Sequence, residues 1–167
     1  MDIARLHLHH FPSGKCDVTG TPVRESLATR LEKSAALAKF SLTPERKTLL
    51  VMGGSQGAHG INQALANALP QLRESPLQVI HLTGRDDEAM MRESYASAGV
   101  PAFVAAFHHR MEEAYSAADL AIARSGAASL TELSHFALPS VLIPLPTAAE
   151  DHQTLNARVL ARYGRSA

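Results

Sequence analysis

The sequence predicts an α/β fold, a Rossmann-like parallel sheet with helices on both of its faces. From Thr48 onward, short apolar runs of strand length alternate five times with segments of helical periodicity. The connections between them are short, and this alternation is typical of a parallel sheet that is covered on both sides. Two of the turns that follow a strand consist mostly of small residues, at the edge of the sheet where ligands usually bind.

The first expected element is a helix over residues 25–40. Leu27, Leu31 and Leu37 recur in this segment at near-helical spacing. The helix should end before Pro44, because the residue that precedes a proline avoids the helical region.

The rest of the chain is expected to alternate between strands and helices. Ile61, Leu65 and Leu69 would share one helix face, and the acidic residues 86–88 suit a helix start, where the dipole favours negative charge. The expected strands are 48–52, 78–83, 101–107, 119–123 and 140–145. The expected helices are 59–72, 86–98, 111–117, 128–136 and 151–163.

Composition narrows the classes of function. The 167 residues suit one domain, and we expect a lead-in or linker over 1–16 and the domain over 17–167. Lys plus Arg and Asp plus Glu both number 16, so no net basic field favours a nucleic-acid partner. A single cysteine, Cys16, suits a reducing cytoplasm, and no apolar run approaches the ~20 residues that span a bilayer. We therefore expect a cytoplasmic protein.

The first small-residue turn, residues 53–57, reads Gly-Gly-Ser-Gln-Gly. Glycines let the backbone approach a ligand closely, and the N–H groups of the following helix would then face an anion, with the Ser55 hydroxyl as a further donor. The turn matches neither the P-loop pattern nor the dinucleotide fingerprint, so it favours neither an ATPase nor a dehydrogenase. A tight turn with no ligand is the alternative interpretation.

Two further segments carry suitable chemistry. Residues 124–128 enter a helix that contains Glu132, whose carboxylate could accept hydrogen bonds from a vicinal diol such as that of ribose. Glu132 could equally be a solvated helix residue. In residues 144–153, an imidazole and an amide could bond sugar hydroxyls, although Asp151 there could be simply a helix N-cap.

Four motifs in this order and spacing resemble those of the MurG family of glycosyltransferases. The resemblance runs from about Asp17 to Tyr163. The motifs are residues 19–24, residues 53–58 with Asn62, residues 124–127 with Thr131 and Glu132, and residues 151–153 with Asn156 and Ala157.

The resemblance implies the C-terminal, donor-binding half of a two-domain GT-B enzyme. Family members transfer N-acetylglucosamine from UDP-N-acetylglucosamine to undecaprenyl-linked muramyl-pentapeptide (lipid I), with inversion, and form lipid II for peptidoglycan. The family's acceptor-binding N-terminal domain carries the catalytic base and the membrane contact, so we expect no catalytic residue in this chain and no activity from it alone. That domain would be a partner in cis or in trans, at the inner face of the cell membrane. No cofactor or metal is expected.

The resemblance also implies roles for individual residues. Arg24 and Ser55 would meet the diphosphate, with Gln56 beside them; Phe107 and His108 would border the uracil; Glu132 would hold the ribose; His152 and Gln153 would face the sugar. The remaining binding residues would be the turn residues Gly54, Gly57, Arg124, Ser125 and Gly126.

Two other functions stay open. The chain could be a UDP-sugar-binding subunit or sensor without chemistry of its own, or the donor subunit of another split glycolipid N-acetylglucosaminyltransferase. A zinc site is not favoured, although His7, His9 and His10 cluster, because such sites need three or four convergent ligands. The neighbours His108 and His109 would point to opposite faces of a strand.

Overall fold

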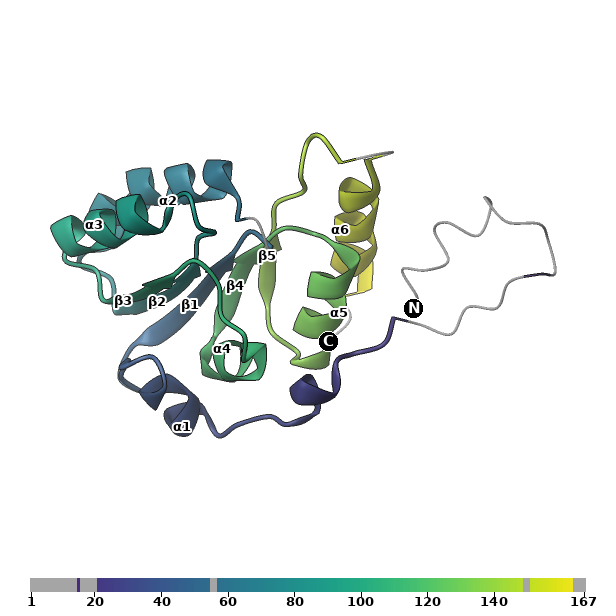
Figure 1. Ribbon diagram of the computed structural model, residues 1–167, viewed down its shortest axis with the longest axis horizontal. Helices are drawn as coiled ribbons and strands as arrows, with labels where there is room; N and C mark the ends of the chain where they lie inside the picture. The colour runs from purple at the N-terminus through teal and green to yellow at the C-terminus, as the bar shows by residue number, and fades with distance from the viewer. Residues whose placement is uncertain (1–14, 16–20, 55–56, 149–150, 164–167) are drawn as a thin grey trace.

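The computed structural model describes residues 15, 21–54, 57–148 and 151–163, and within them a five-stranded sheet lies between helices (Figure 1). The strand order is β3-β2-β1-β4-β5, and all four neighbouring pairs are parallel. The strands are β1 (Lys47–Met52), β2 (Leu77–Leu82), β3 (Ala102–Ala105), β4 (Leu120–Ala123) and β5 (Ser140–Leu142). The helices are η2 (Glu25–Ala28), α1 (Lys33–Ala38), α2 (His59–Leu72), α3 (Glu88–Ala98), α4 (Met111–Ala117), α5 (Ala127–His135) and α6 (His152–Tyr163).

The central strand β1 separates two hydrophobic cores. Leu49 and Val51 face one core, which α2 and α3 complete. Leu50 and Met52 face the other, which η2, α1, α4 and α5 complete. In Figure 1, α2 and α3 accordingly cover one face of the sheet, and α1 and α4 cover the other. Because side chains alternate along a strand, a strand buried on both faces reads as a continuous apolar run, and this confirms the predicted fold class.

The single helix expected over residues 25–40 is wrong. A short 3-10 helix, η2, ends at Ala28, Thr29 is extended with φ −95° and ψ 114°, and α1 begins only at Lys33. The Glu32 carboxylate accepts the backbone N–H groups of Ser34 and Ala35 and so caps the new helix. The backbone N–H of Leu31 turns away to the hydroxyl of Ser116, 3.1 Å distant. Contacts with α4 and this cap therefore override the helical spacing of the leucines.

Two strands are shorter than expected because the paired ladder ends early and only single backbone hydrogen bonds continue beyond it. β3 stops at Ala105, where Leu82 is its last paired residue, instead of continuing to residue 107. β5 stops at Leu142, opposite Ala123, instead of continuing to residue 145. Helices α2 and α4 have the predicted bounds, and the other boundaries differ by one or two residues. The lead-in predicted over residues 1–16 falls almost wholly outside the described residues.

The part of the chain that the structure describes contains no helix that is both long and apolar enough to cross a membrane.

Candidate functional site

The candidate site lies at the point where the strand order of the sheet reverses, between β1 and β4. From β1 the chain proceeds outward through β2 to β3, whereas β4 returns to the other side of β1 and leads to β5. Met52 and Ala123, the last residues of β1 and β4, are direct neighbours in the ladder. The turn that begins at Gly53 and the turn that begins at Arg124 therefore leave the same edge side by side. In open parallel sheets, this crevice is the usual ligand site.

The glycines of the first turn are required by close backbone contacts. A Cβ on Gly53 would lie 2.3 Å from the backbone nitrogen of Ala58. Gly57 has φ +78°, and a Cβ there would lie 2.2 Å from the carbonyl oxygen of Thr83. Both distances are too short for any side chain, so only glycine fits. Gly54 closes the turn, since its carbonyl accepts the N–H of Gly57 over 3.0 Å. The predicted residues Ser55 and Gln56 lie outside the described residues.

Two helices present their positive ends at this crevice. The N-cap of α2 is Ala58 and the N-cap of α5 is Gly126, and neither makes a side-chain capping bond among the described residues. Neither helix has an acidic residue in its first turn. The first N–H groups of a helix have no partner within it, and the helix dipole adds positive potential there. The pair of helix ends is therefore suited to an anion.

Glu132 lies in the second turn of α5 and is held from two sides. Its Oε1 is 2.9 Å from Nη2 of Arg24, and its Oε2 accepts a hydrogen bond of 2.7 Å from the Tyr115 hydroxyl. The Glu132 side chain is only 13% exposed, so it is not a solvated helix residue. Arg24 is 56% exposed, which leaves part of its guanidinium open to solvent beside the carboxylate.

Sequence reasoning missed Tyr115. Its side chain is buried, and burial, together with the hydrogen bond to Glu132, raises the pKa of its phenol above the ordinary value. The phenol therefore remains a donor. In the sequence this tyrosine looks like any core aromatic on a helix, and no local signal distinguishes it.

The third motif lies against the second turn. The Ser125 hydroxyl donates to the Gln153 carbonyl over 2.8 Å, and the buried Asn156 amide donates to the Ser125 carbonyl over 3.0 Å. The Gln153 side chain in turn accepts the N–H of Leu145 through its Oε1. The predicted residues Ser125 and Gln153 are thus brought together, because the start of α6 lies against the turn after β4. His152 is half-buried.

Arg124 binds the backbone of its own domain. Its Nη1 donates to the carbonyl of Ile143 over 3.2 Å and to the carbonyl of Pro144 over 2.9 Å. This side chain therefore connects the turn after β4 to the loop after β5. Its observed contacts account for an arginine here without any ligand.

The structure separates the two residues expected to border a base. Phe107 is 44% exposed, and the guanidinium carbon of Arg85 lies 5.8 Å from the centre of its ring. His108 turns inward, with Nε2 3.0 Å from Oε2 of the buried Glu113 and its ring packed against Phe40. Phe107 is accordingly the one of the pair that offers an open aromatic surface. Arg85, which sequence reasoning did not consider, shares that surface.

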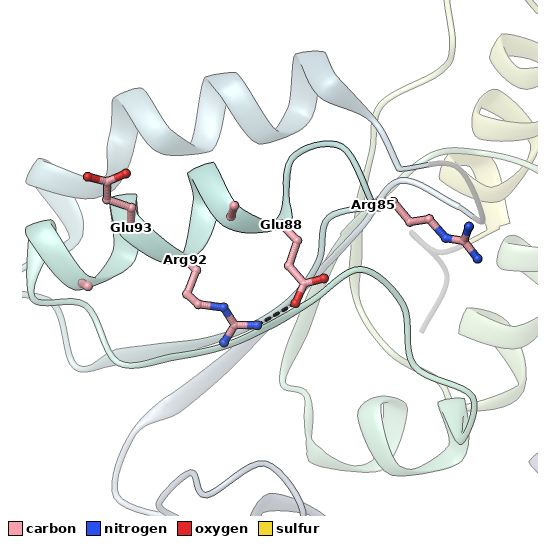
Figure 2. A pocket seen from close by; sticks show the side chains of 6 residues that line it. Arg85, Glu88, Arg92 and Glu93 are labelled. Carbon is pink, nitrogen blue, oxygen red and sulfur yellow. Dashed lines mark hydrogen bonds and ion pairs between the residues drawn. The ribbon is translucent and has the colours of Figure 1, made fainter.

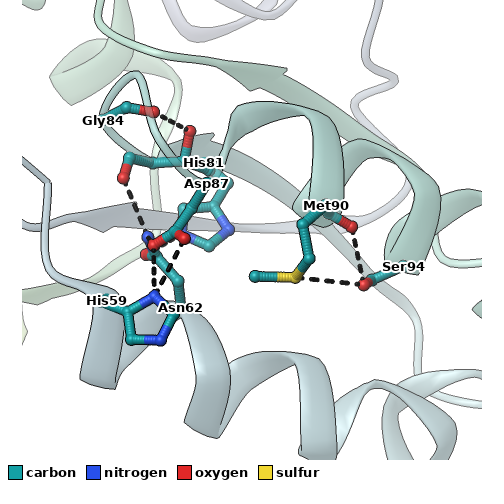
Figure 3. A network of polar contacts seen from close by, with 8 residues as sticks. His59, Asn62, His81, Gly84, Asp87, Met90 and Ser94 are labelled. Atoms are coloured by element: carbon teal, nitrogen blue, oxygen red, sulfur yellow. Dashed lines mark hydrogen bonds and ion pairs between the residues drawn. The ribbon is translucent and has the colours of Figure 1, made fainter.

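A polar network, buried except for the exposed side chain of His59, lies next to the first turn (Figure 3). The Asn62 amide donates to the Thr83 carbonyl over 2.8 Å and to Oδ2 of Asp87 over 2.7 Å, and its oxygen faces His81 Nε2 at 3.0 Å. His59 Nδ1 lies 2.9 Å from Asp87 Oδ1. The carbonyl that Asn62 binds is the one that Gly57 approaches, so the network fixes the surface on which the glycine turn rests.

Two opposing effects act on Asp87 within this network. Burial alone would raise its pKa, but hydrogen bonds from Asn62 and His59 outweigh burial and hold the pKa below its usual range. Asp87 therefore stays ionised beside the helix start, as a carboxylate with two donors should.

A shallow groove of about 560 Å³ lies along α3 (Figure 2). Within it, Arg92 pairs with Glu88 over 2.6 Å and donates to the carbonyl of Val104, while Glu88 accepts the N–H of Ala106. β3 is an edge strand, and these side chains bond backbone groups at its open side. Their role is therefore structural. The lining residues are Arg85, Glu88, Ala89, Arg92, Glu93 and Ala96.

Within the described ranges, no group of three or more His, Cys, Asp or Glu side chains is placed to hold a metal ion. The clustered histidines His7, His9 and His10 lie outside those ranges.

Comparison with known proteins identifies the family and the fold. Residues 48–166 match the model of the glycosyltransferase family 28 C-terminal domain. The chain belongs to this family. Family 28 membership and the five-stranded parallel sheet confirm the predicted family and fold class.

Two curated relatives are similar over nearly the whole chain, and both are named UDP-N-acetylglucosamine--N-acetylmuramyl-(pentapeptide) pyrophosphoryl-undecaprenol N-acetylglucosamine transferase. The protein from Parabacteroides distasonis is 47% identical over 154 residues, which cover 90% of this chain and 41% of the relative. The protein from Pseudomonas savastanoi pv. phaseolicola is 43% identical over 153 residues, which cover 91% of this chain and 41% of the relative. The chain therefore spans about two fifths of the length of these relatives.

A solved structure shows the same fold. The crystal structure of Acinetobacter baumannii MurG superposes with a TM-score of 0.71 at 35% sequence identity, covering 93% of this chain and 42% of that one. These comparisons do not assign individual binding residues, so the residue roles stay predictions.

Proposed function

We propose that this chain is the donor-binding part of a glycosyltransferase that moves N-acetylglucosamine from UDP-N-acetylglucosamine to undecaprenyl-linked muramyl-pentapeptide. The observation that carries the proposal is that two helix ends and the paired carboxylate Glu132 converge at one crevice. Neither helix end has a side-chain cap among the described residues. An anion and a diol are the two features that a nucleoside diphosphate offers. The names of the curated relatives supply the sugar and the acceptor.

The diphosphate would lie between the N-terminal ends of α2 and α5. The backbone N–H groups of Gly54 and Gly126 would face it, whereas the N–H of Gly57 already donates to the Gly54 carbonyl and closes the turn. Ser55 and Gln56 belong to the same sequence motif. Arg24 would contribute positive charge from the side, because its guanidinium is partly exposed and carries further N–H donors beyond the bond to Glu132.

The nucleoside and the sugar would lie on opposite sides of the diphosphate. Glu132 would accept hydrogen bonds from the ribose hydroxyls. Phe107, the open member of the pair Phe107 and His108, would border the uracil. His152 and Gln153 would face the hydroxyls of N-acetylglucosamine at the start of α6, next to Ser125.

The reaction would be a displacement at the anomeric carbon. A muramyl hydroxyl of the acceptor attacks this carbon, the bond from the carbon to the diphosphate oxygen breaks, and the configuration inverts. The departing UDP takes the electron pair, and the two helix ends with Arg24 stabilise its charge. The base that removes the hydroxyl proton would come from an acceptor domain in cis or in trans, as the resemblance to the MurG family implies.

The same partner domain would bring the lipid-linked acceptor, and the assembled enzyme would act at the cytoplasmic face of the cell membrane. A UDP-sugar-binding subunit without chemistry would use the same site but would need no such domain.

Calorimetric titration tests the proposal. We expect UDP-N-acetylglucosamine and UDP to bind this chain, UDP-glucose to bind more weakly, and ADP not to compete. No binding of any uridine ligand to the folded chain would contradict the donor-site assignment. Adding an acceptor domain and lipid I should then produce transfer, and binding without transfer would favour the subunit or sensor function.

A further inference from the structure

We propose that Tyr115 is a positioning residue that orients Glu132 for the ribose diol of a uridine ligand. This inference rests on the proposed function, because it assumes that Glu132 meets ribose. Three segments far apart in the sequence meet at this carboxylate: Arg24 before η2, Tyr115 in α4, and Glu132 itself in α5.

Tyr115 is anchored by the core and not by the site. Tyr115 is 3% exposed, and its ring packs against Phe136 with the ring centres 5.1 Å apart. The hydroxyl also lies 3.7 Å from the sulfur of Met52, at the end of β1. The ring therefore cannot follow a moving carboxylate, and the 2.7 Å bond holds Glu132 Oε2 at a fixed point relative to the sheet.

The direction of the hydrogen bond is fixed by chemistry. An ionised carboxylate only accepts, so the Tyr115 hydroxyl must donate. Burial of the ring keeps the pKa of this phenol above its ordinary value, and the proton stays on the oxygen at any working pH.

The geometry leaves room for a diol. A carboxylate offers about four lone-pair positions. Tyr115 occupies one on Oε2 and Arg24 occupies one on Oε1, so that each oxygen keeps one position. Two donors on opposite oxygens also fix the plane of the carboxylate, whose terminal torsion is otherwise broad. The two remaining positions, one on each oxygen, are the ones that two adjacent ribose hydroxyls would use.

A purely structural role for the hydroxyl makes a different prediction. If Tyr115 only satisfied a half-buried carboxylate, its removal would lower stability and would affect all ligands equally. If Tyr115 orients Glu132 toward ribose, its removal must affect most the ligand that carries both ribose hydroxyls.

The test compares UDP with 2′-deoxy-UDP on the full chain, using Tyr115→Phe. Tyr95→Phe is the matched control, because Tyr95 is also 3% exposed and its hydroxyl bonds His81 at 3.1 Å in the other core. The wild-type chain should bind UDP more tightly than 2′-deoxy-UDP. Tyr115→Phe should weaken UDP binding by roughly 3- to 10-fold, the scale of one hydrogen bond, and should reduce the preference for UDP.

The outcomes separate the two proposals. A wild-type chain that binds UDP with a ribose preference, and keeps that preference in Tyr115→Phe, overturns the role of Tyr115 alone. A wild-type chain that binds UDP no better than 2′-deoxy-UDP overturns the ribose role of Glu132 and this inference with it. A loss of preference in Tyr95→Phe as large as in Tyr115→Phe also overturns the inference, since a distant buried hydroxyl would then suffice.

A second variant tests the coupling directly and does not depend on Tyr115→Phe being well folded by itself. In a chain that already carries Glu132→Gln, adding Tyr115→Phe should change UDP affinity by less than about 2-fold, because the group it orients is gone. Independent, multiplying losses in the double variant would overturn the inference.

Discussion

Asn62 Oδ1 and His81 Nε2 lie 3.0 Å apart in the core beneath the glycine turn, and the direction of this hydrogen bond defines the state of the histidine. Both amide hydrogens of Asn62 are committed to Thr83 and Asp87, so its oxygen must accept from His81. The other ring nitrogen of His81 then accepts from the Tyr95 hydroxyl, 3.1 Å away. His81 is therefore neutral, with its proton on Nε2.

The neutral state of His81 predicts that stability falls in mild acid. Burial lowers the pKa of His81 to about 4, although the negative charge of Asp87 acts to raise it. In the unfolded chain this histidine has its ordinary pKa of 6.5. Between these two pH values only the unfolded state binds a proton at His81. The contribution of neutral His81 to the free energy of unfolding is therefore fully present above about pH 6.5 and is lost as the pH falls toward 4. We expect the free energy of unfolding to fall by about 2 kcal/mol from pH 7 to pH 5 through this residue.

Denaturant unfolding at the two pH values measures this loss. His81→Gln should reduce the dependence on pH, since an amide can still donate to Asn62 but does not titrate in this range. His109→Gln, at an exposed histidine, is the control and should leave the dependence unchanged. If the free energy of unfolding fell equally with pH in the wild type and in His81→Gln, groups other than His81 would cause the loss.

Gly57→Ala should damage the candidate site and the fold together. Its φ is +78°, and its Cβ would lie 2.2 Å from the Thr83 carbonyl oxygen, so the turn must shift. We expect a loss of about 2 kcal/mol or more in stability and a strong loss of UDP binding.

Gly60→Ala is the matched control for this change, because Gly60 is helical and no atom of the described residues lies within 4 Å of its Cβ position. It should keep binding and gain up to about 1 kcal/mol of stability. Thermal unfolding with parallel titration checks both variants. Equal behaviour of the two alanine variants would contradict the close approach seen at Gly57.

Glu132→Ala should weaken binding of UDP by roughly 1–3 kcal/mol, the scale of hydrogen bonds to a charged group. The truncation also removes the partner of Arg24 and Tyr115, so circular dichroism should first show that the fold is retained. Calorimetry with UDP then gives the affinity. Unchanged affinity in a folded variant would remove Glu132 from the site.

Phe107→Ala should reduce affinity for uridine ligands without destabilising the fold. The ring is 44% exposed and its contacts are with the exposed side chains of Arg85 and His109, so little buried area is lost. Loss of a base-bordering ring should cost about 1–2 kcal/mol in binding. An unaltered affinity for UDP, measured beside an unaltered melting temperature, would place the base elsewhere.

Local sequence patterns determined much of this protein. The spacing of Ile61, Leu65 and Leu69 predicts α2 with its observed bounds, because one apolar helical face is a local property. The glycines at 53 and 57 predict a tight strand-to-helix turn, because no other residue fits. The order of the motifs predicts the family that the comparisons show.

The tertiary structure alone decided the rest. Leu27, Leu31 and Leu37 suggest one helix, but the contact of Leu31 with Ser116 and the cap at Glu32 break it. These contacts join residues distant in the sequence, and local periodicity carries no record of them.

The pairing of Tyr115 with Glu132 and the network around His81 are of the same kind. A tyrosine, a histidine or an asparagine on an apolar face reads as ordinary core until its hydrogen-bond partner is known. The partner is set by how α4 packs beside α5 and how α2 packs over β2. A buried polar group must be satisfied wherever the packed chain places it, so only the folded arrangement shows which residue does so.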